Sequence, residues 1–160
     1  MEEKKSGNIW KLIAAIVICE ATGIIGSLVT DSDSEWYRTL VKPSFNPPSW
    51  VFAPVWTTLY LLMGIAAYLV WKQGLQNRAV KQALLIFVAQ LVLNGIWSPV
   101  FFGMHQVGGA LLVIILLWLM IVLTILRFYP LSRVAAYLLI PYLLWVSFAS
   151  VLNFAIWRLN

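Results

Sequence analysis

Hydrophobic residues along the chain gather in five long stretches that contain few or no charged residues. Each stretch is close to the roughly 20 residues that an α-helix needs to cross about 30 Å of hydrocarbon. The later connectors are short and turn-like, so we expect neighbouring helices to run antiparallel. The pattern predicts one domain over residues 1–160, an all-α integral membrane protein with a bundle of five transmembrane helices at about Ile9–Val29, Val51–Trp71, Gln82–Phe102, Gly108–Leu126 and Val134–Trp157.

The first connector, about residues 30–50, differs from the others because some twenty residues is long for a loop in a compact domain. It is rich in aromatic residues, and its prolines restrict the backbone to extended geometry. These features predict a lid that folds back over the bundle. The alternative is an interfacial belt, where Trp and Tyr are enriched in membrane proteins; composition favours neither. The residues in question are Trp36, Tyr37, Leu40, Phe45 and Trp50.

Composition supports the membrane assignment and narrows the possible chemistry. Of 160 residues, 62% are hydrophobic and 11% charged, against about 45–50% and about 25% in a soluble domain. The single cysteine, Cys19, and the single histidine, His105, cannot supply a disulfide framework or a multi-ligand metal site. We therefore expect no metal and no resident cofactor.

The formal charge of +5 comes from basic residues at helix ends rather than from a surface patch, so we expect no nucleic-acid partner. In a five-helix arrangement one side of the membrane holds only Arg38, Lys42 and Arg158. In a plasma membrane the positive-inside rule then predicts a cytoplasmic N-terminus and an external C-terminus. The basic residues of the cytoplasmic side are Lys4, Lys5, Lys11, Lys72, Arg78, Lys81, Arg127 and Arg133.

The first stretch contains the one acid that we expect at membrane depth, Glu20. On a helix it shares a face with Gly23 and Ser27. It is either a ligand or proton site or a hydrogen-bonded packing residue, because polar groups are costly in hydrocarbon without a partner. Ala15, Cys19, Gly23 and Ser27 also form a small-residue face, which suits helix contact in a homodimer, packing inside the monomer or a position beside the ligand.

Aromatic and amide side chains form helical stripes on three of the predicted helices. Prolines at positions 99 and 141 are expected to kink two of them. Such stripes predict either a tightly packed core or an intramembrane pocket for a flat, mostly apolar ligand such as a porphyrin or sterol. The stripes are Trp56, Tyr60 and Met63; Gln90, Asn94, Trp97 and Phe101; and Tyr142, Trp145, Ala149, Leu152 and Asn153.

The sequence contains no recognisable catalytic set. A Ser–His–acid arrangement, a glycine-rich phosphate loop and paired carboxylates within the helices are all missing. The sequence therefore does not favour an enzyme. Any chemistry would have to come from the photochemistry of a bound pigment or from tryptophan redox.

Three segments resemble a known family. They read WYRTLVKPSFNPPSWVFAPVWTTLYLLMG, QLVLNGIWSPVFFG and PYLLWVSFASVLNFAIWRLN. In this order and spacing they resemble the TspO/MBR family, the tryptophan-rich sensory proteins and the translocator proteins or peripheral-type benzodiazepine receptors. The resemblance covers about Gly23 to Asn160.

The resemblance implies a membrane receptor or sensor that binds protoporphyrin, haem and related flat ligands under the lid loop, often as a homodimer. Transport of tetrapyrroles or sterols is the alternative. It also implies that Trp56 and Trp145 act in light-dependent porphyrin breakdown, if that reaction occurs. The ligand-binding residues that it implies are Tyr37, Trp56, Tyr60, Asn94, Trp97, Trp145 and Ala149.

One departure from the family affects the sterol expectation. The sterol-recognition stretch of animal members has an aliphatic residue, then a tyrosine, then a basic residue. Here the corresponding residues are Leu152, Phe154 and Arg158, so the tyrosine is missing. Even an intact motif of this kind is only a weak pattern, and we do not expect a sterol partner on this basis.

Overall fold

The computed structural model describes residues 2–32 and 34–160, with side chains from residue 9 onward. Lys4 and Lys5, which the charge argument uses, thus lie outside the residues with described side chains. Helices account for most of the described chain. They are α1 (Glu2–Ser27), α2 (Glu35–Thr39), the short 3-10 helix η1 (Ser49–Val51), α3 (Phe52–Trp71), α4 (Arg78–Ser98), the π-helical turn η2 (Pro99–Gly103), α5 (Val107–Phe128), α6 (Arg133–Leu138) and α7 (Ile140–Leu159).

The predicted all-α membrane fold is confirmed, and the protein is an integral multi-pass membrane protein. Within the described residues, five helical segments are long and apolar enough to cross a bilayer. Their ends fall within a few residues of the predicted ones. The spans are Ile9–Ser27, Ser49–Trp71, Arg78–Gly103, Val107–Phe128 and Arg133–Leu159.

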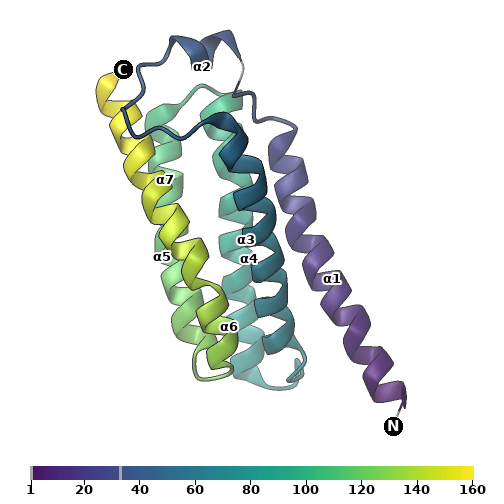
Figure 1. Ribbon diagram of the computed structural model, residues 1–160. Helices are drawn as coiled ribbons and strands as arrows, with labels where there is room; N and C mark the ends of the chain where they lie inside the picture. The colour runs from purple at the N-terminus through teal and green to yellow at the C-terminus, as the bar shows by residue number, and fades with distance from the viewer. Residues whose placement is uncertain (1, 33) are drawn as a thin grey trace.

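The spans form an up-and-down bundle in which α3, α4, α5 and α7 run side by side and α1 leans along the outside (Figure 1). The N-terminus, the α3–α4 connector and α6 lie at one end of the molecule. The segment between α1 and α3, which includes α2, crosses the other end near the C-terminus. There Asn160 pairs with the backbone of Val41 through two hydrogen bonds, from Val41 N to Asn160 Oδ1 (2.9 Å) and from Asn160 Nδ2 to Val41 O (3.0 Å).

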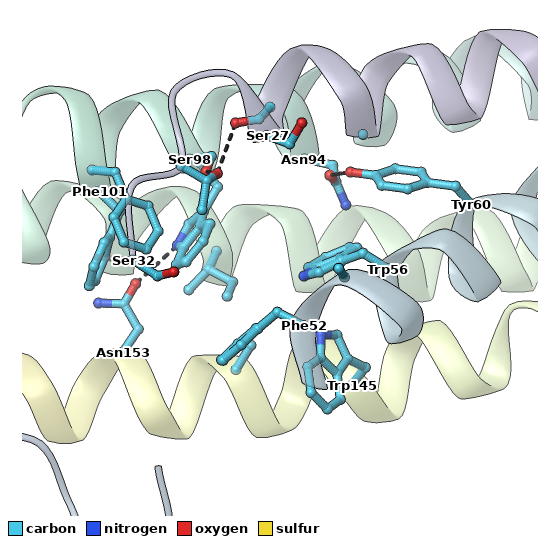
Figure 2. Close-up of a pocket in the computed structure, with 18 of the residues that line it drawn as sticks. Ser27, Ser32, Phe52, Trp56, Tyr60, Asn94, Ser98, Phe101, Trp145 and Asn153 are labelled. Carbon is cyan, nitrogen blue, oxygen red and sulfur yellow. Dashed lines mark hydrogen bonds between the residues drawn. The ribbon is translucent and has the colours of Figure 1, made fainter. Parts of the chain in front are cut away.

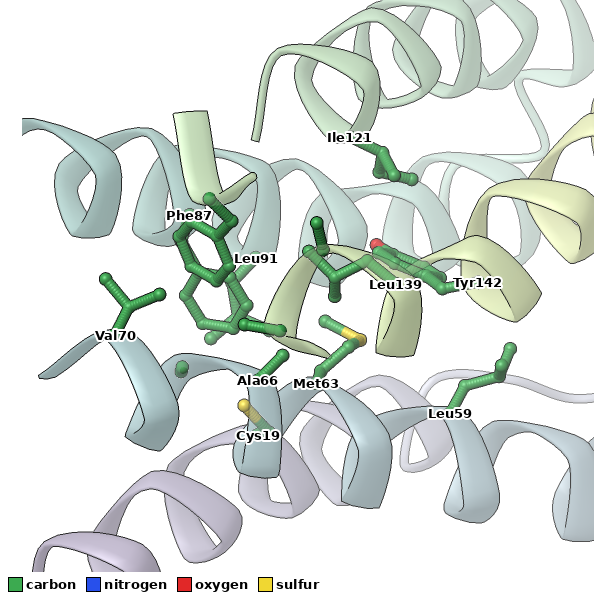
Figure 3. Close-up of a cluster of buried hydrophobic side chains, with 14 of the residues drawn as sticks. Cys19, Leu59, Met63, Ala66, Val70, Phe87, Leu91, Ile121, Leu139 and Tyr142 are labelled. Carbon is green, nitrogen blue, oxygen red and sulfur yellow. The ribbon is translucent and has the colours of Figure 1, made fainter. Parts of the chain in front are cut away.

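A dry core fills the interior of the bundle (Figure 3). Met63 and Ala66 of α3 are completely buried there, together with Leu139 and Tyr142 from the last span. Phe87 of α4 stacks on Phe128 of α5, with ring centroids 5.8 Å apart. Close packing of this kind, rather than helix amphipathicity, holds helices together in lipid, because hydrocarbon tails are as apolar as the side chains.

Regular α-helix is interrupted at or next to both of the prolines that were expected to kink their helices. After Pro99 the last turn of the third span widens into a π-helix, where Met104 N donates to Pro99 O at 2.9 Å. The fifth span is divided at Leu139 into α6 and α7, and Pro141 stands in the first turn of α7. A proline is tolerated there because the first turn has no internal acceptor for its N–H.

Part of the small-residue face of α1 packs inside the monomer. Ala15 and Cys19 are 5% and 1% exposed. Nearby, α1 and α3 approach so closely that a Cβ added to Gly64 would lie 2.6 Å from Ile16 Cα. Gly23 is half-buried and Ser27 is exposed. The predicted homodimer stays a prediction.

Candidate functional site

A cavity of about 420 Å³ opens between the spans at the end of the bundle that carries the α2 segment (Figure 2). Its walls come from every span and from the segment between α1 and α3. Aromatic and aliphatic side chains predominate, with hydroxyl, amide and carboxyl groups among them. The lining residues are Glu20, Gly23, Ile24, Gly26, Ser27, Thr30, Ser32, Tyr37, Ser49, Phe52, Ala53, Trp56, Thr57, Tyr60, Asn94, Trp97, Ser98, Phe101, Phe102, Ile114, Leu117, Trp145, Ala149, Leu152, Asn153 and Ile156.

The structure brings all the sequence-predicted ligand residues to this one cavity. They are Tyr37, Trp56, Tyr60, Asn94, Trp97, Trp145 and Ala149. Three other members of the aromatic and amide stripes, Met63, Gln90 and Tyr142, are buried in the packed interior instead. The stripes therefore run from the core into the cavity, and their role in ligand binding stays a prediction.

A chain of buried hydrogen bonds joins the cavity to the core. Tyr60 Oη donates to Asn94 Oδ1 (2.5 Å), and Asn94 Nδ2 donates to Tyr142 Oη (2.7 Å). Tyr142 Oη in turn donates to Gln90 Oε1 (2.8 Å). Hydrogen bonds in a low-dielectric interior are strong and orient the groups that make them. Asn94 and Tyr60 are thus held in one orientation in the cavity wall.

A second set of hydrogen bonds fixes the indole ring of Trp97. Its Nε1 donates to Asn153 Oδ1 at 3.0 Å, and Asn153 Nδ2 donates to Val107 O at 3.0 Å. The ring also stacks on Phe101, with centroids 5.1 Å apart. Asn153 thereby joins three spans around one flat aromatic wall of the cavity.

Trp56 and Trp145 lie in the wall formed by α3 and α7 (Figure 2). Trp56 stacks on Tyr60 at 5.5 Å between centroids. Trp145 meets Phe52 edge-on at 5.9 Å. Its Nε1 is buried and has no hydrogen-bond acceptor among the described residues. Both indoles present apolar, polarizable surface to a bound molecule.

The segment between α1 and α3 contributes Tyr37, which is 8% exposed. Its ring lies 5.4 Å from that of Phe102, and the Lys42 ammonium stands 4.4 Å over it. Lys42 Nζ also donates to Tyr37 O at 2.6 Å. By contrast Trp50 is 74% exposed, as expected for an interfacial residue. The buried Tyr37 agrees with a lid over the bundle, and the exposed Trp50 agrees with an interfacial belt. A lid function stays a prediction.

Helix α1 supplies a wall that the predicted ligand set omitted. Glu20, Gly23, Ser27 and Thr30 line the cavity from this side, and the Thr30 hydroxyl shares a hydrogen bond with Ser98 of α4. The sequence did contain a signal, namely the common helical face of Glu20, Gly23 and Ser27. What it could not show was which neighbouring helix that face meets.

The cavity has the size and composition of a small-molecule site. Its volume falls in the range of ligand pockets, about 300–1,000 Å³, which are largely apolar with a few placed polar groups. Among the described residues no group of three or more His, Cys, Asp or Glu side chains could hold a metal ion.

Comparison with known proteins finds a family model and relatives that match most of the chain. The sequence model of the TspO/MBR family matches residues 15–158. The tryptophan-rich protein TspO of Chlorobaculum tepidum is 48% identical over 154 residues, which are 96% of this chain and 98% of that protein. The TspO of Archaeoglobus fulgidus is 46% identical over 154 residues, 96% and 99% of the two chains.

A human relative matches over a shorter length. The translocator protein of Homo sapiens is 46% identical over 127 residues, which are 78% of this chain and 75% of that protein. The family model, over residues 15–158, includes most of the first span, nearly all of the other four and every residue that lines the cavity. The chain belongs to the TspO/MBR family.

Proposed function

We propose that the protein is a membrane receptor for porphyrin-like tetrapyrroles, such as protoporphyrin or haem, and holds them in the aromatic cavity. The observation that carries the proposal is that Trp56, Trp97 and Trp145 line the cavity together with Tyr37. Flat π-systems pack well against such rings, at roughly 0.5–1.5 kcal/mol beyond area burial for each aromatic pair. A sensing or regulatory role follows, because the site lacks a catalytic set.

A dark titration of the purified protein with protoporphyrin tests the proposal. Tryptophan fluorescence is followed in the wild type, in Trp56→Phe and in Trp145→Phe. Trp10→Phe is the matched control, because Trp10 is 55% exposed on α1 and does not line the cavity. Saturable quenching that either cavity substitution weakens by about tenfold, or about 1.4 kcal/mol, supports the proposal.

Three outcomes of the titration would contradict the proposed site. Quenching that never saturates, or that changes as much in Trp10→Phe as in the cavity variants, would mean that the pigment partitions into detergent. The aromatic walls would then be packing surfaces. Binding that is saturable but insensitive to both cavity substitutions would place the porphyrin site elsewhere on the protein.

Light-dependent breakdown of the bound porphyrin is a second candidate function, favoured by the position of Trp56 and Trp145 against the cavity. The reaction would need light and dioxygen, with the macrocycle as the molecule that is oxidised. Illumination should give a product that free porphyrin does not give. The product should disappear in Trp56→Phe or Trp145→Phe while dark binding persists; an identical product from free porphyrin at the same rate would refute an enzymatic role.

Transport is the alternative to reception, since mammalian relatives are named translocator proteins. Directional flux of a tetrapyrrole into proteoliposomes would support it, and saturable binding without flux would exclude it. A sterol is a poorer cargo here. Of the residues at the sterol-recognition positions, Leu152 lines the cavity while Phe154 is 49% exposed, so the two do not form one site.

The proposed topology has a cytoplasmic N-terminus. The N-terminus lies at the same end as the α3–α4 connector, which carries Lys72 and Arg78 (Figure 1). In sealed right-side-out vesicles, trypsin should cut after Arg38 and leave the α3–α4 connector intact; Lys42 is not a cleavage site because Pro43 follows it. Cleavage of that connector from outside would reverse the topology.

A homodimer stays a proposal that rests on the family resemblance. Ala15 and Cys19 of the small-residue face of α1 are buried within the monomer, so they would not form the contact. Mass measurement in mild detergent tests this directly. A population that contains only monomers at every protein concentration would exclude a stable dimer.

A further inference from the structure

One acidic side chain lies in the cavity wall on α1. Glu20 is the only charged residue among the described residues that line the cavity. It is half-buried, and in the described part of the chain it has no hydrogen-bond or ion-pair partner. An ionisable group inside a membrane span is expensive without a partner, and such groups typically mark ligand or ion pathways.

The packing of α1 explains why Glu20 stays uncovered. One turn earlier, at Ile16, the backbones of α1 and α3 nearly touch, because Gly64 has no side chain. At Gly23 the missing Cβ leaves room for the ring of Tyr60; a Cβ there would lie 2.6 Å from Tyr60 Cδ2. Glu20 therefore stands where the close helix contact ends and the cavity begins.

The hydroxyl groups on this wall are already committed to other acceptors. Tyr60 Oη donates to Asn94 Oδ1 at 2.5 Å. Ser27 Oγ donates to Ile24 O at 2.7 Å, and Thr30 Oγ1 bonds to Gly26 O at 2.8 Å and to Ser98. A hydroxyl has one proton to donate. These hydroxyl groups thus have no free donor for Glu20, and a bound molecule could supply one.

We propose that Glu20 is a ligand-binding residue whose carboxyl accepts a hydrogen bond from an N–H, O–H or ammonium group of a flat ligand. This inference rests on the proposed role of the cavity as a binding site, and it adds a selectivity that the aromatic walls do not provide. A ligand carboxylate is disfavoured against α1 by like charge. A porphyrin dicarboxylate consequently binds with its acidic edge turned away from Glu20.

The test uses two flat probes of opposite charge, 9-aminoacridine and protoporphyrin. Dissociation constants are measured by tryptophan quenching for the wild type, Glu20→Gln and Glu20→Asp. Glu35→Gln is the matched control, because it removes the same charge from an exposed residue outside the cavity. Thermal unfolding of each variant confirms that it is folded; if Glu20→Gln is not, Glu20→Asp carries the comparison.

We expect Glu20→Gln to weaken 9-aminoacridine binding by about tenfold, as for loss of a hydrogen bond to a charged group. Protoporphyrin binding should be unchanged or tighter in the same variant. Glu20→Asp, whose carboxyl is withdrawn by one methylene, should lie between the wild type and Glu20→Gln for 9-aminoacridine. Glu35→Gln should change neither constant.

Three results would overturn the inference: an equal loss for both probes, which indicates a packing role; no loss for 9-aminoacridine; or an equal effect of Glu35→Gln. Failure of the porphyrin proposal looks different. If 9-aminoacridine binding depends on Glu20 while protoporphyrin never saturates, Glu20 is a ligand residue of a site that takes other flat molecules. If protoporphyrin binds saturably and Glu20 affects neither probe, the receptor function stands without the Glu20 contact.

Discussion

Tyr142 is fully buried and joins α7 to α4 through one hydroxyl group. The hydroxyl accepts a hydrogen bond from Asn94 and donates one to Gln90, and the Gln90 amide nitrogen has no partner among the described residues. A buried polar group that is left without a partner destabilises the fold by more than its hydrogen bond had stabilised it. The arrangement under the cavity therefore depends strongly on this single oxygen.

Replacement of Tyr142 by phenylalanine should destabilise the folded protein by about 1–3 kcal/mol, because the amides of Asn94 and Gln90 each lose a partner in an apolar interior. Thermal or denaturant unfolding in detergent measures the loss. Tyr68→Phe is the control, since no hydrogen bond of the Tyr68 hydroxyl is found in the described chain. Equal stability of the two variants would show that the buried network contributes little.

Tyr37 should make the folded protein sensitive to alkali. Burial raises the pKa of its hydroxyl above the ordinary value of 10.0, an effect that a hydrogen bond with Asn46 partly opposes. The unfolded chain therefore loses this proton first as the pH rises. The contribution of the neutral Tyr37 hydroxyl to the stability of the fold is complete below about pH 10 and declines as the pH approaches the raised pKa.

The difference between tyrosine absorbance titrations of the wild type and Tyr37→Phe isolates this group. Its midpoint should lie above about pH 10, and unfolding temperature should fall more between about pH 9 and pH 11 in the wild type than in Tyr37→Phe. A midpoint at the ordinary tyrosine value, or the same alkaline loss in both proteins, would mean that the ring is not held in the cavity wall.

The contact of α1 with α3 depends on Gly64. A Cβ at this position would lie 2.6 Å from Ile16 Cα and 3.0 Å from Ile16 N, and backbone atoms cannot rotate away. Gly64→Ala should therefore lower the free energy of unfolding by about 1–3 kcal/mol, the usual cost of overpacking, and shift α1. Gly26→Ala is the control on α1 itself, because a Cβ there meets nothing within 4 Å.

Unfolding of both glycine variants in the same detergent gives the comparison. If Gly64→Ala is as stable as Gly26→Ala, α1 is attached loosely and can adjust its distance from α3. The wall that carries Glu20 would then be adaptable, and variants of Glu20 would report a movable subsite rather than a preformed one.

The helices were predictable from sequence because a bilayer fixes both their length and their apolar composition. The inward stripes of α3, α4 and α7 were predictable too, since helical spacing puts Asn94, Trp97 and Phe101 on one face. Spacing cannot separate cavity from core along a stripe. Gln90 and Met63 continue two stripes and are buried in the packed interior.

The contribution of α1 was not predictable because it depends on the contact between two helices that a long segment separates in sequence. Small residues at positions 15, 19, 23 and 27 fit a dimer as well as they fit an intramolecular contact. The structure places Gly64 opposite Ile16, and nothing in local periodicity reveals that pairing. The same contact brings Glu20 to the cavity.

The cavity is formed by the whole bundle, since every span and the segment that contains Tyr37 contribute to its walls. A ligand that binds there contacts the folded bundle and has no site in the separated helices, so occupancy should stabilise the entire fold. At a free concentration about 100 times the dissociation constant the gain is about 2.7 kcal/mol. Protoporphyrin should therefore raise the unfolding temperature of the wild type and Trp10→Phe alike, and that of Trp145→Phe less at the same concentration. Saturable quenching without any rise in unfolding temperature would contradict binding in the cavity, because a molecule that contacts all the spans must stabilise their association. The porphyrin would then lie against the outer, lipid-facing tryptophans.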